Sequence, residues 1–364
     1  MALTVFVINP ANTDETWEMP TYDVKWTEEI NTIKSGNFSA PFRSLKDLAE
    51  KIGTTPTYII KGGPRKVVIK DESFTDDPLL FAGWLRDYQF SATASEPSSI
   101  TINFADFGVM LSKRRGQEFY FYNNVQSGWI FRQELYIAQN QTNGDMGLTM
   151  AQLPATTSRQ RTVERTNLLD LLMGMSNAKT RDGFDFDVDK NGVITLYSPQ
   201  RGSVQENIII ESRNAQQPQL NGKLTSGLAN KVYVQGGELR DADGDVTQEA
   251  MEVIVEDTDS QGVWGLHEEY ISATDIATEP FLIQRGQQAL NAGAVPNDTE
   301  SITGNHPGND PDWRSYDVGD WLFVDLPDYD LSQFLRVRRR TIEYKGGYYK
   351  VTGISFSREG VPNG

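Results

Sequence analysis

The sequence predicts a mainly β protein with a few short helices, divided into several domains. Its 364 residues exceed what one ordinary hydrophobic core holds, so we expect roughly two to three domains. Short runs of β-branched and aromatic residues recur along the chain, and several of them alternate polar with apolar residues. The 31 glycines and 16 prolines supply the turns that many short strands require.

Residues 1–115 carry strand patterns with one helix among them. Ser44 can cap a helix over residues 44–52, which Gly53 ends, and the apolar residues of this segment share one face. The expected strands are residues 3–8, 22–26, 67–69, 79–84 and 100–104. We therefore expect a small β-barrel with one helix in this part of the chain.

The middle of the chain has a different character. Residues 139–158 are rich in Gln, Asn, Gly and Thr, which predicts an exposed loop. Thr166 can cap a short helix over residues 167–175, whose leucines predict burial. Residues 184–197 alternate apolar with polar on both sides of an Asn-Gly dipeptide, which is a strong local signal for a β-hairpin.

The last third predicts strands around a second helix. Thr278 can cap a helix over residues 279–292, and Gly293 can end it. Residues 297–312 are polar and contain Gly and Pro, which predicts a loop. The expected strands are residues 231–234, 251–255, 321–324, 334–344 and 348–356, the last two joined by a turn at Lys345-Gly346-Gly347.

The hairpin segment also matches the first half of a calcium-binding loop. Asp187, Asp189 and Asn191 stand at alternate positions, and Gly192 follows them. The position that needs a bidentate Glu holds Ser198, and strands rather than helices flank the loop. These departures favour a hairpin with a polar turn over a calcium site.

Two other patterns fall short of metal-site signatures. The acidic run 241–245 has Glu252 at the correct distance, but Val246 replaces the glycine that a calcium loop needs. His267 is followed by two glutamates, as in zinc-protease helices, but the second histidine is missing and His306 is remote in sequence. We interpret the first as a solvated turn and expect no metal-binding residues.

No motif for catalysis or cofactor binding is present. The chain contains no cysteine, which excludes thiol nucleophiles and zinc–thiolate sites. It also lacks a Gly-x-Ser-x-Gly elbow, a phosphate-binding loop and a dinucleotide fingerprint. We therefore expect a protein that is not an enzyme, with no catalytic or cofactor-binding residues and no cofactor. Four tryptophans could line a sugar groove, although scattered tryptophans more often belong to cores or interfaces: Trp17, Trp26, Trp129 and Trp313.

The charge balance argues against tight binding of nucleic acid. With 34 basic and 50 acidic residues, the formal net charge is −16. The dense basic candidates are Lys113-Arg114-Arg115 and residues 336–340, and both are short. Such a chain repels phosphate weakly, which suits the wall of a channel through which DNA must slide.

The second basic segment predicts a charged strand face within a barrel wall over residues 316–356. Its acidic partners could belong to the same subunit or to the next one, which would place the face at an interface between subunits. The alternative is an exposed edge strand whose charges prevent aggregation. The basic side chains Arg336, Arg338 and Arg340 alternate with Val337, Arg339 and Thr341, and the acidic candidates upstream are Asp325, Asp328 and Asp330.

The N-terminus predicts a first strand rather than a leader peptide. Residues 3–8 are apolar but lack a basic flank and a small-residue cleavage site. No apolar stretch approaches the length that spans a membrane. We expect a soluble protein that is synthesised and assembled in a cytoplasm.

Five segments, in their order along the chain, resemble the hub proteins of bacteriophage tails. This family includes the baseplate hubs of contractile tails and the tail-associated hub proteins of non-contractile ones. The segments are LLFAGWL (79–85); INFADF (102–107) with the arginines after it; residues 168–175 with GFDF (183–186) and its hairpin; NKVYVQG (230–236); and VGDWLFV (318–324) with the closing hairpin.

The resemblance implies a homotrimer and a place in the virion. Each subunit would contain two tube-like β-barrels with inserted and peripheral domains, and three subunits would adapt the hexameric tail tube to a threefold tip. The ring would form part of the DNA channel, and passing DNA would not be bound specifically. Expected partners are the tail tube and distal tail proteins, the tape measure protein, and a central fibre or needle protein. The expected location is the tail tip or baseplate, after assembly in the bacterial host cytoplasm.

The resemblance also implies a division into domains. Residues 1–115 would form the first barrel, completed by about residues 205–237, and residues 116–204 an inserted α+β domain. Residues 238–300 would form a peripheral α+β segment, and residues 301–364 would close the second barrel. Since many relatives carry an enzyme or fibre region beyond the hub, the end at Gly364 suggests a bare hub.

Two other functions stay open at this point. A cell-wall-degrading tail enzyme would need a cleft with a perturbed pair of carboxylates. A glycan-binding tail module would need an exposed aromatic platform. The hub would instead show two similar barrels around a pore.

Overall fold

The computed structural model describes residues 3–61, 63–91, 98–176, 184–211, 218–223, 227–240, 246–293, 297–302 and 312–357. Strands dominate, with a few short helices between them, so the predicted fold class is confirmed. The buried apolar residues form four clusters, which follow one another approximately along the chain. Within the described residues, no helix is long and apolar enough to cross a membrane.

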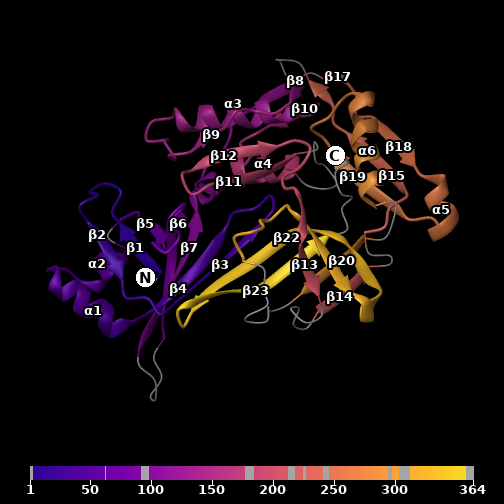
Figure 1. Cartoon of the computed structure of the whole chain (residues 1–364). Helices are drawn as coiled ribbons and strands as arrows, with labels where there is room; N and C mark the ends of the chain where they lie inside the picture. The colour runs from indigo at the N-terminus through magenta and orange to yellow at the C-terminus, as the bar shows by residue number, and fades with distance from the viewer. Residues whose placement is uncertain are drawn as a thin grey trace.

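One sheet of 13 strands joins the two ends of the chain. Its path is β14 (Pro218–Lys223), β20 (Asn297–Ile302), β23 (Tyr348–Ser357), β22 (Leu331–Lys345), β3 (Asp23–Glu29), β4 (Ser35–Pro41), β7 (Ser99–Asp106), β6 (Leu79–Ser91), β5 (Lys66–Lys70), β1 (Thr4–Ile8) and β2 (Thr16–Met19), with β21 (Trp321–Leu326) on β22 and β13 (Val204–Glu211) on β21. Figure 1 shows β3 beside β22 and β23 in the middle of the molecule. Trp26 of β3 lies opposite Ile342 of β22, which joins the N-terminal part to the C-terminal part.

The sheet differs from the two separate barrels that we expected. Its path has two ends, β2 and β14, and no barrel closes in the described part of the chain. Strands β13 and β14, from the segment expected to complete the first barrel, lie in the same sheet as the first strands, where β13 pairs with β21 and β14 pairs with β20. Part of the expected loop 297–312 is strand β20 instead. The division of the chain into domains stays a prediction.

The N-terminal core lies between β1–β7 and two helices, α1 (Phe42–Lys51) and α2 (Pro56–Lys61). Helix α1 begins two residues earlier than predicted, directly after Pro41, and no side chain caps it, so Ser44 is not its cap. Leu45 is buried as its helical face predicted. Helix α2 was not expected, because its six residues are too few to show a periodic pattern.

The middle core contains two helices over short strands. It comprises the 3-10 helix η1 (Phe107–Lys113), β8 (Tyr120–Gln126), α3 (Ser127–Gln139), β9 (Thr149–Met150), β10 (Ser158–Val163), α4 (Leu168–Ser176), β11 (Asp185–Val188) and β12 (Val193–Tyr197). The predicted hairpin is confirmed as β11 and β12. Asn167 rather than Thr166 caps α4, since its side-chain oxygen accepts from the backbone N–H of Leu169 at 3.0 Å. The predicted exposed loop 139–158 is wrong in part, because Met146 and Leu148 are buried and β9 pairs with β12.

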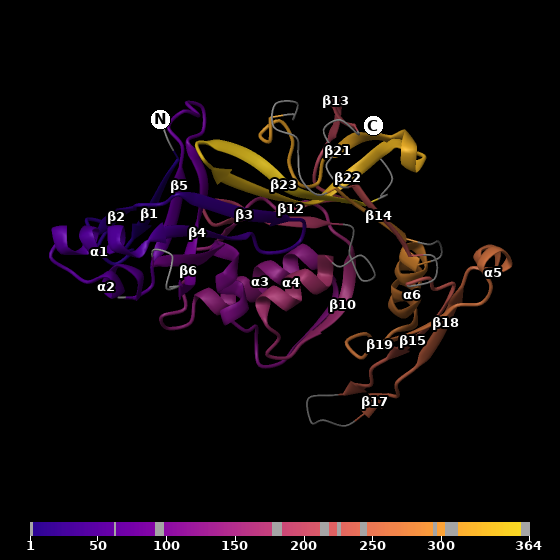
Figure 2. The same ribbon diagram turned by 90° about the horizontal axis from the view of Figure 1, so that it is seen from below.

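A third core forms a peripheral unit. It comprises β15 (Lys231–Gly236), β16 (Leu239–Arg240), β17 (Val246–Gln248), β18 (Glu252–Glu256), α5 (Thr258–Trp264), β19 (Glu268–Ala273) and α6 (Glu279–Gly293). Helix α6 packs on one face of the three-stranded sheet β18–β15–β19. Figure 2 shows this unit at the opposite end of the molecule from α1 and α2. The predicted helix at 279–292 is confirmed as α6. Thr278 is the cap that we expected for it, and its hydroxyl donates to the side-chain oxygen of Gln160 at 3.1 Å.

The fourth core belongs to the C-terminal strands β21, β22 and β23, with apolar residues of β13 added to it. The 3-10 helix η2 (Pro327–Tyr329) connects β21 to β22. The closing hairpin is confirmed: Gly346 and Gly347 between β22 and β23 have φ values of 63° and 91°, which glycine adopts at no steric cost. The closing segment therefore forms the side of the large sheet that meets β3.

Candidate functional site

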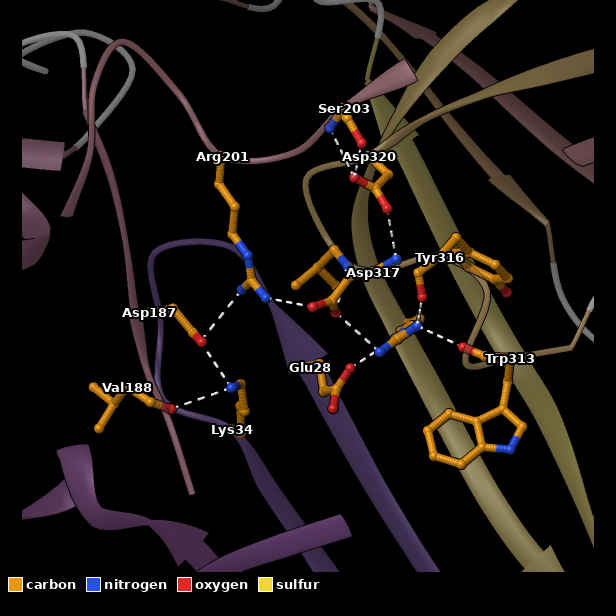
Figure 3. A network of polar contacts seen from close by, with 12 residues as sticks. Glu28, Lys34, Asp187, Val188, Arg201, Ser203, Trp313, Tyr316, Asp317 and Asp320 are labelled. Atoms are coloured by element: carbon orange, nitrogen blue, oxygen red, sulfur yellow. Dashed lines mark hydrogen bonds and ion pairs between the residues drawn. The ribbon is translucent and has the colours of Figure 1, made fainter. Parts of the chain in front are cut away.

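The densest group of buried charges lies where β3, β11, β22 and the segment before β21 meet (Figure 3). These elements belong to the N-terminal, middle and C-terminal cores, so the group connects three of the four. We call it the charge junction. Its members are Glu28, Lys34, Asp106, Asp185, Asp187, Arg201, Asp317, Asp320, Arg336 and Arg340.

Arg340 of β22 lies at the centre of one half of the junction. Its Nε donates to Glu28 at 2.6 Å, and its Nη2 donates to Asp317 at 2.9 Å. Its Nη1 reaches the carbonyl oxygens of Trp313, at 2.8 Å, and of Tyr316. Burial raises the pKa of Asp317, but Arg340 and Arg201 outweigh that effect and hold it below its ordinary value. The guanidinium thus fixes β3 and the segment before β21 on β22.

Arg336 of β22 connects the C-terminal strands to the middle core. Its Nη2 pairs with Asp185 of β11, and its Nε donates to the carbonyl of Gly319 at 3.1 Å. The guanidinium also lies 4.9 Å from the centroid of the Trp321 ring. Burial raises the pKa of Asp185, but the charge of Arg336 and hydrogen bonds to the carboxylate keep it lowered.

Lys34, Asp187 and Arg201 connect the two halves of the junction. Lys34 lies between β3 and β4, and its ammonium contacts Asp187 of β11 at 2.8 Å. Arg201 follows β12 and contacts Asp187 at 3.3 Å with one nitrogen, while another nitrogen pairs with Asp317. Figure 3 shows this chain of alternating charges between Lys34 and Asp317. Both positive groups therefore contact Asp187 of β11, and Arg201 also connects it to Asp317 before β21.

Asp106 is the acid of the junction whose pKa departs strongly from its ordinary value. Burial raises its pKa to about 7, although the nearby charge of Lys34 acts to lower it. Its two oxygens accept the backbone N–H groups of Lys34 and Gly108, each at 2.8 Å. Only 2% of the residue is exposed. A carboxylate enclosed in this way cannot contact a substrate, so its raised pKa does not indicate catalysis.

The junction is therefore suited to hold elements in place. Its guanidinium and carboxylate groups contact one another, backbone atoms or neighbouring polar side chains within the fold. In the part of the chain that the structure describes, no three His, Cys, Asp or Glu residues lie close enough together to hold a metal ion. Removing one partner of a buried pair of this kind is costly, because it leaves the other charge buried without a counter-charge.

The calcium-like segment forms the tight turn that we favoured. Asp189 accepts the backbone N–H groups of Asn191 and Val193, each at 2.8 Å. Asp187 belongs to the charge junction instead. The acidic run 241–245 and His306 lie outside the described residues. His267 precedes strand β19, so it does not start a helix of the zinc-protease type.

Of the two basic candidates, Lys113-Arg114-Arg115 is partly open to solvent, since Lys113 and Arg115 are exposed. Arg114 binds the carbonyl of Ala138 near the end of α3 and that of Gly144 beyond it, and Arg115 binds the carbonyl of Arg165.

The predicted basic strand face is wrong. Arg336 and Arg340 are buried inside one subunit, with Asp185, Glu28 and Asp317 as their partners rather than Asp325, Asp328 or Asp330. A register shift between Val337 and Arg339 also interrupts the alternation on which the basic face depended. Reversing these charges would therefore disturb the fold of a subunit before any interface.

The tryptophans do not form a shared platform. Trp17 and Trp26 belong to the N-terminal core, and Trp313 packs on Trp26 with ring centroids 5.7 Å apart. Trp129 is 53% exposed, but it lies on α3, in the middle core. Tryptophans in these positions are mostly core residues, as the sequence favoured.

Most members of the junction were not predicted as a site from the sequence, but the strand pattern around Glu28 indicates a buried charge. Glu28 continues the alternation that buries Val24 and Trp26, so it is an acid on the buried face of its strand. Such a position requires a buried cation. Its partner Arg340 is 312 positions away, which no local pattern reveals.

No protein-family model matches the chain, and no curated protein matches it by sequence. Solved structures do match its fold over almost the whole chain. The 43 kDa tail protein of prophage MuSo2 from Shewanella oneidensis has a TM-score of 0.61 at 12% identity, covering 98% of both chains. Prophage tail protein gp18 from Listeria monocytogenes has a TM-score of 0.60 at 12% identity, covering 99% of this chain and 95% of its own.

A third structure extends the similarity to another source. A tail protein from Neisseria meningitidis has a TM-score of 0.61 at 11% identity, covering 99% of this chain and 98% of its own. The three matches include every core described above, rather than one common motif. The chain therefore has the fold of phage tail proteins.

Proposed function

We propose that this chain is a structural hub of a phage tail tip or baseplate. The observation that carries the proposal is the similarity in fold to three tail proteins, each aligned over at least 95% of its own length. The five sequence segments that resemble hub proteins, in the same order along the chain, favour a hub over other tail components. Neither observation depends on a site, so the proposal concerns architecture rather than chemistry.

In this proposal, three subunits form a ring between the hexameric tail tube and a threefold tip. The ring would be part of the DNA channel, and its other contacts would be with distal tail proteins, the tape measure protein and a central fibre or needle. The net charge of −16 is compatible with a channel that passes DNA without binding it. The charge junction supports the role, because a hub must keep its parts in one fixed arrangement.

A structural role also agrees with the chemistry of the buried acids. The acid with the most perturbed environment, Asp106, is enclosed and bonded to backbone N–H groups. Catalytic acids need access to a substrate as well as a shifted pKa. We therefore propose that the chain has no catalytic activity of its own.

Immunogold electron microscopy on tail particles that carry an epitope-tagged copy of the chain tests the proposal. We expect gold at the end of the tail that is distal to the capsid, at one position per particle. Labelling along the shaft of the tail, or particles without label, would contradict a hub. A tagged major tube protein provides the control for labelling along the shaft.

A further inference from the structure

An apolar groove with lysines at its rim lies on one face of strands β1, β5 and β6. Its volume is about 440 Å³. Phe6 lies opposite Val68 across β1 and β5, and Val68 lies opposite Ala82 across β5 and β6, so the floor is a cross-strand row. The alternate residues Val5 and Val7 point to the N-terminal core, so the groove is on the other face. The middle core packs against part of that face, and the turn between β11 and β12 lines one side of the groove. We call it the lysine-rimmed groove; Ile8 and Leu79 extend its floor, and its rim contains Lys66, Lys70 and Lys190.

The rim of the groove is positively charged in a strongly acidic chain. The Lys66 ammonium lies 5.0 Å from the centroid of the Phe107 ring, and the Lys70 ammonium lies 6.0 Å from that of Phe6. Among the ion pairs of the described residues, neither lysine has a carboxylate partner, whereas Lys190 pairs with Asp77. The chemistry of the groove therefore suits an occupant with apolar side chains and acidic neighbours.

Helix α5 offers that combination at the other end of the molecule. It projects from the peripheral unit, as Figures 1 and 2 show. The apolar side chains of this region are open to solvent. Val263 is 72% exposed, Trp264 42% and Leu266, just beyond the helix, 58%. The exposed acids nearby are Glu256, Asp259 and Glu268. Apolar residues gathered on a projecting element mark interaction sites, and tryptophan is enriched among the residues that dominate them.

The groove and α5 cannot meet within one subunit, because they lie at opposite ends of it (Figure 1). Contact between two different surfaces of identical subunits is head-to-tail, and such contacts close into rings when the rotation permits. We infer that α5 of each subunit docks into the lysine-rimmed groove of the next subunit, with Trp264 on the apolar floor and Glu256 and Asp259 near Lys66 and Lys70. This inference rests on the proposed homotrimer and names the surfaces that would join its subunits.

The absence of cysteine from the chain permits a direct cross-linking test. Thr16 lines the groove and Leu266 lies beside α5, so we would introduce Thr16→Cys in one preparation and Leu266→Cys in another. Mixing and oxidising the two should give a covalent dimer, and a chain with both cysteines should give a covalent closed trimer. Tyr329→Cys is the matched control, because Tyr329 lies on η2, away from the groove, and is 47% exposed. A cysteine at this position should not cross-link to Leu266→Cys.

A second measurement uses substitutions of exposed or half-buried side chains. We expect Trp264→Ala to raise the concentration at which half of the trimer dissociates by about tenfold or more, measured by light scattering. Lys66→Glu with Lys70→Glu should also weaken the trimer, since it places acids opposite Glu256 and Asp259. Trp129→Ala removes a tryptophan of α3 that is also exposed, and Lys46→Glu reverses an exposed lysine on α1; both should leave the trimer unchanged.

The outcomes separate this inference from the proposed function. If wild-type protein forms a trimer but the cysteines do not cross-link and Trp264→Ala dissociates like the wild type, the docking of α5 is wrong and the trimeric hub survives. If wild-type protein stays a monomer at all concentrations, the proposed trimer fails and the docking fails with it. Cross-linking of Thr16→Cys only to itself would indicate a symmetric contact and would overturn the head-to-tail arrangement.

Discussion

The guanidinium of Arg336 and the carboxylate of Asp185 form an ion pair in which the two side chains are 0% and 1% exposed. The residues are 151 positions apart, on β22 and on β11. Asp185 also accepts the side-chain amide of Asn31 at 2.8 Å and the backbone N–H of Arg201 at 2.9 Å. One carboxylate therefore binds groups from the N-terminal strands, the middle core and the C-terminal strands.

Removing one partner of this pair should destabilise the protein strongly. Arg336→Met leaves the Asp185 carboxylate buried without its cation, and we expect a loss of about 3–5 kcal/mol in the free energy of unfolding. Urea denaturation followed by fluorescence measures it. Arg339→Met is the control, because its pair with Glu29 spans 3.9 Å between side chains that are 55% and 48% exposed, and it should cost about 1 kcal/mol or less. Equal effects of the two substitutions would show that the buried pair has no special role.

The raised pKa of Asp106 predicts a stability that declines as the pH rises. Its folded pKa of about 7 lies above its ordinary value of 3.8, so the folded protein binds the proton more tightly than the unfolded chain does. The stabilisation is complete below the ordinary value and is lost as the pH rises through 7. Between pH 5 and pH 7 the wild type should lose about 2 kcal/mol more than Asp106→Asn. Urea denaturation at the two pH values checks this, and parallel pH profiles for both proteins would contradict it.

Gly83 is a position where the sheet admits no side chain. A Cβ added there would lie 2.0 Å from the carbonyl oxygen of Ala105 on β7, and a backbone atom cannot yield cheaply. We expect Gly83→Ala to destabilise the protein by about 2–3 kcal/mol. Gly353→Ala is the matched control, since it also lies in a strand but a Cβ there meets nothing within 4 Å. Thermal unfolding of the two variants should differ by several degrees, and equal midpoints would refute the steric argument.

The turn at Asp189 should not respond to calcium. One carboxylate oxygen of Asp189 already accepts two backbone N–H groups, and Ser198 stands where a calcium loop has its bidentate Glu. We expect the same thermal midpoint in calcium and in a chelator. A shift of several degrees, which corresponds to about 1 kcal/mol or more, would overturn this prediction for the chain as a whole, including the acidic run 241–245.

Local patterns predicted the elements that local interactions stabilise. The hairpin of β11 and β12 has an Asn-Gly turn between alternating residues, and α6 has a proline in its first turn. The sequence pattern of each element is therefore recognisable within about 15 residues. Helix α3 lacks such signals. Its N-cap residue, Gln126, makes no capping hydrogen bond; instead the Thr156 hydroxyl, from a later segment, accepts the backbone N–H of Gly128. At the other end, Arg114 from a preceding segment binds the carbonyl of Ala138. Its helical form therefore depends on tertiary contacts that a local pattern does not contain.

The charge junction and the single large sheet could not be predicted because they depend on pairings between the two ends of the chain. Alternation indicated that β3 and β22 are strands, but it carries no information about which strand is the neighbour. The arginines of β22 illustrate the consequence. Their alternation suggested a basic strand face paired with Asp325, Asp328 or Asp330, whereas the β3–β22 pairing buries Arg340 beside Glu28.

Electron microscopy of the purified, assembled protein tests the central claim most directly, because it shows subunit number and channel together. The proposed hub predicts rings with threefold symmetry and an open central channel, with one peripheral unit projecting from each subunit. Monomers at every concentration, or a ring with a different number of subunits, would contradict the account.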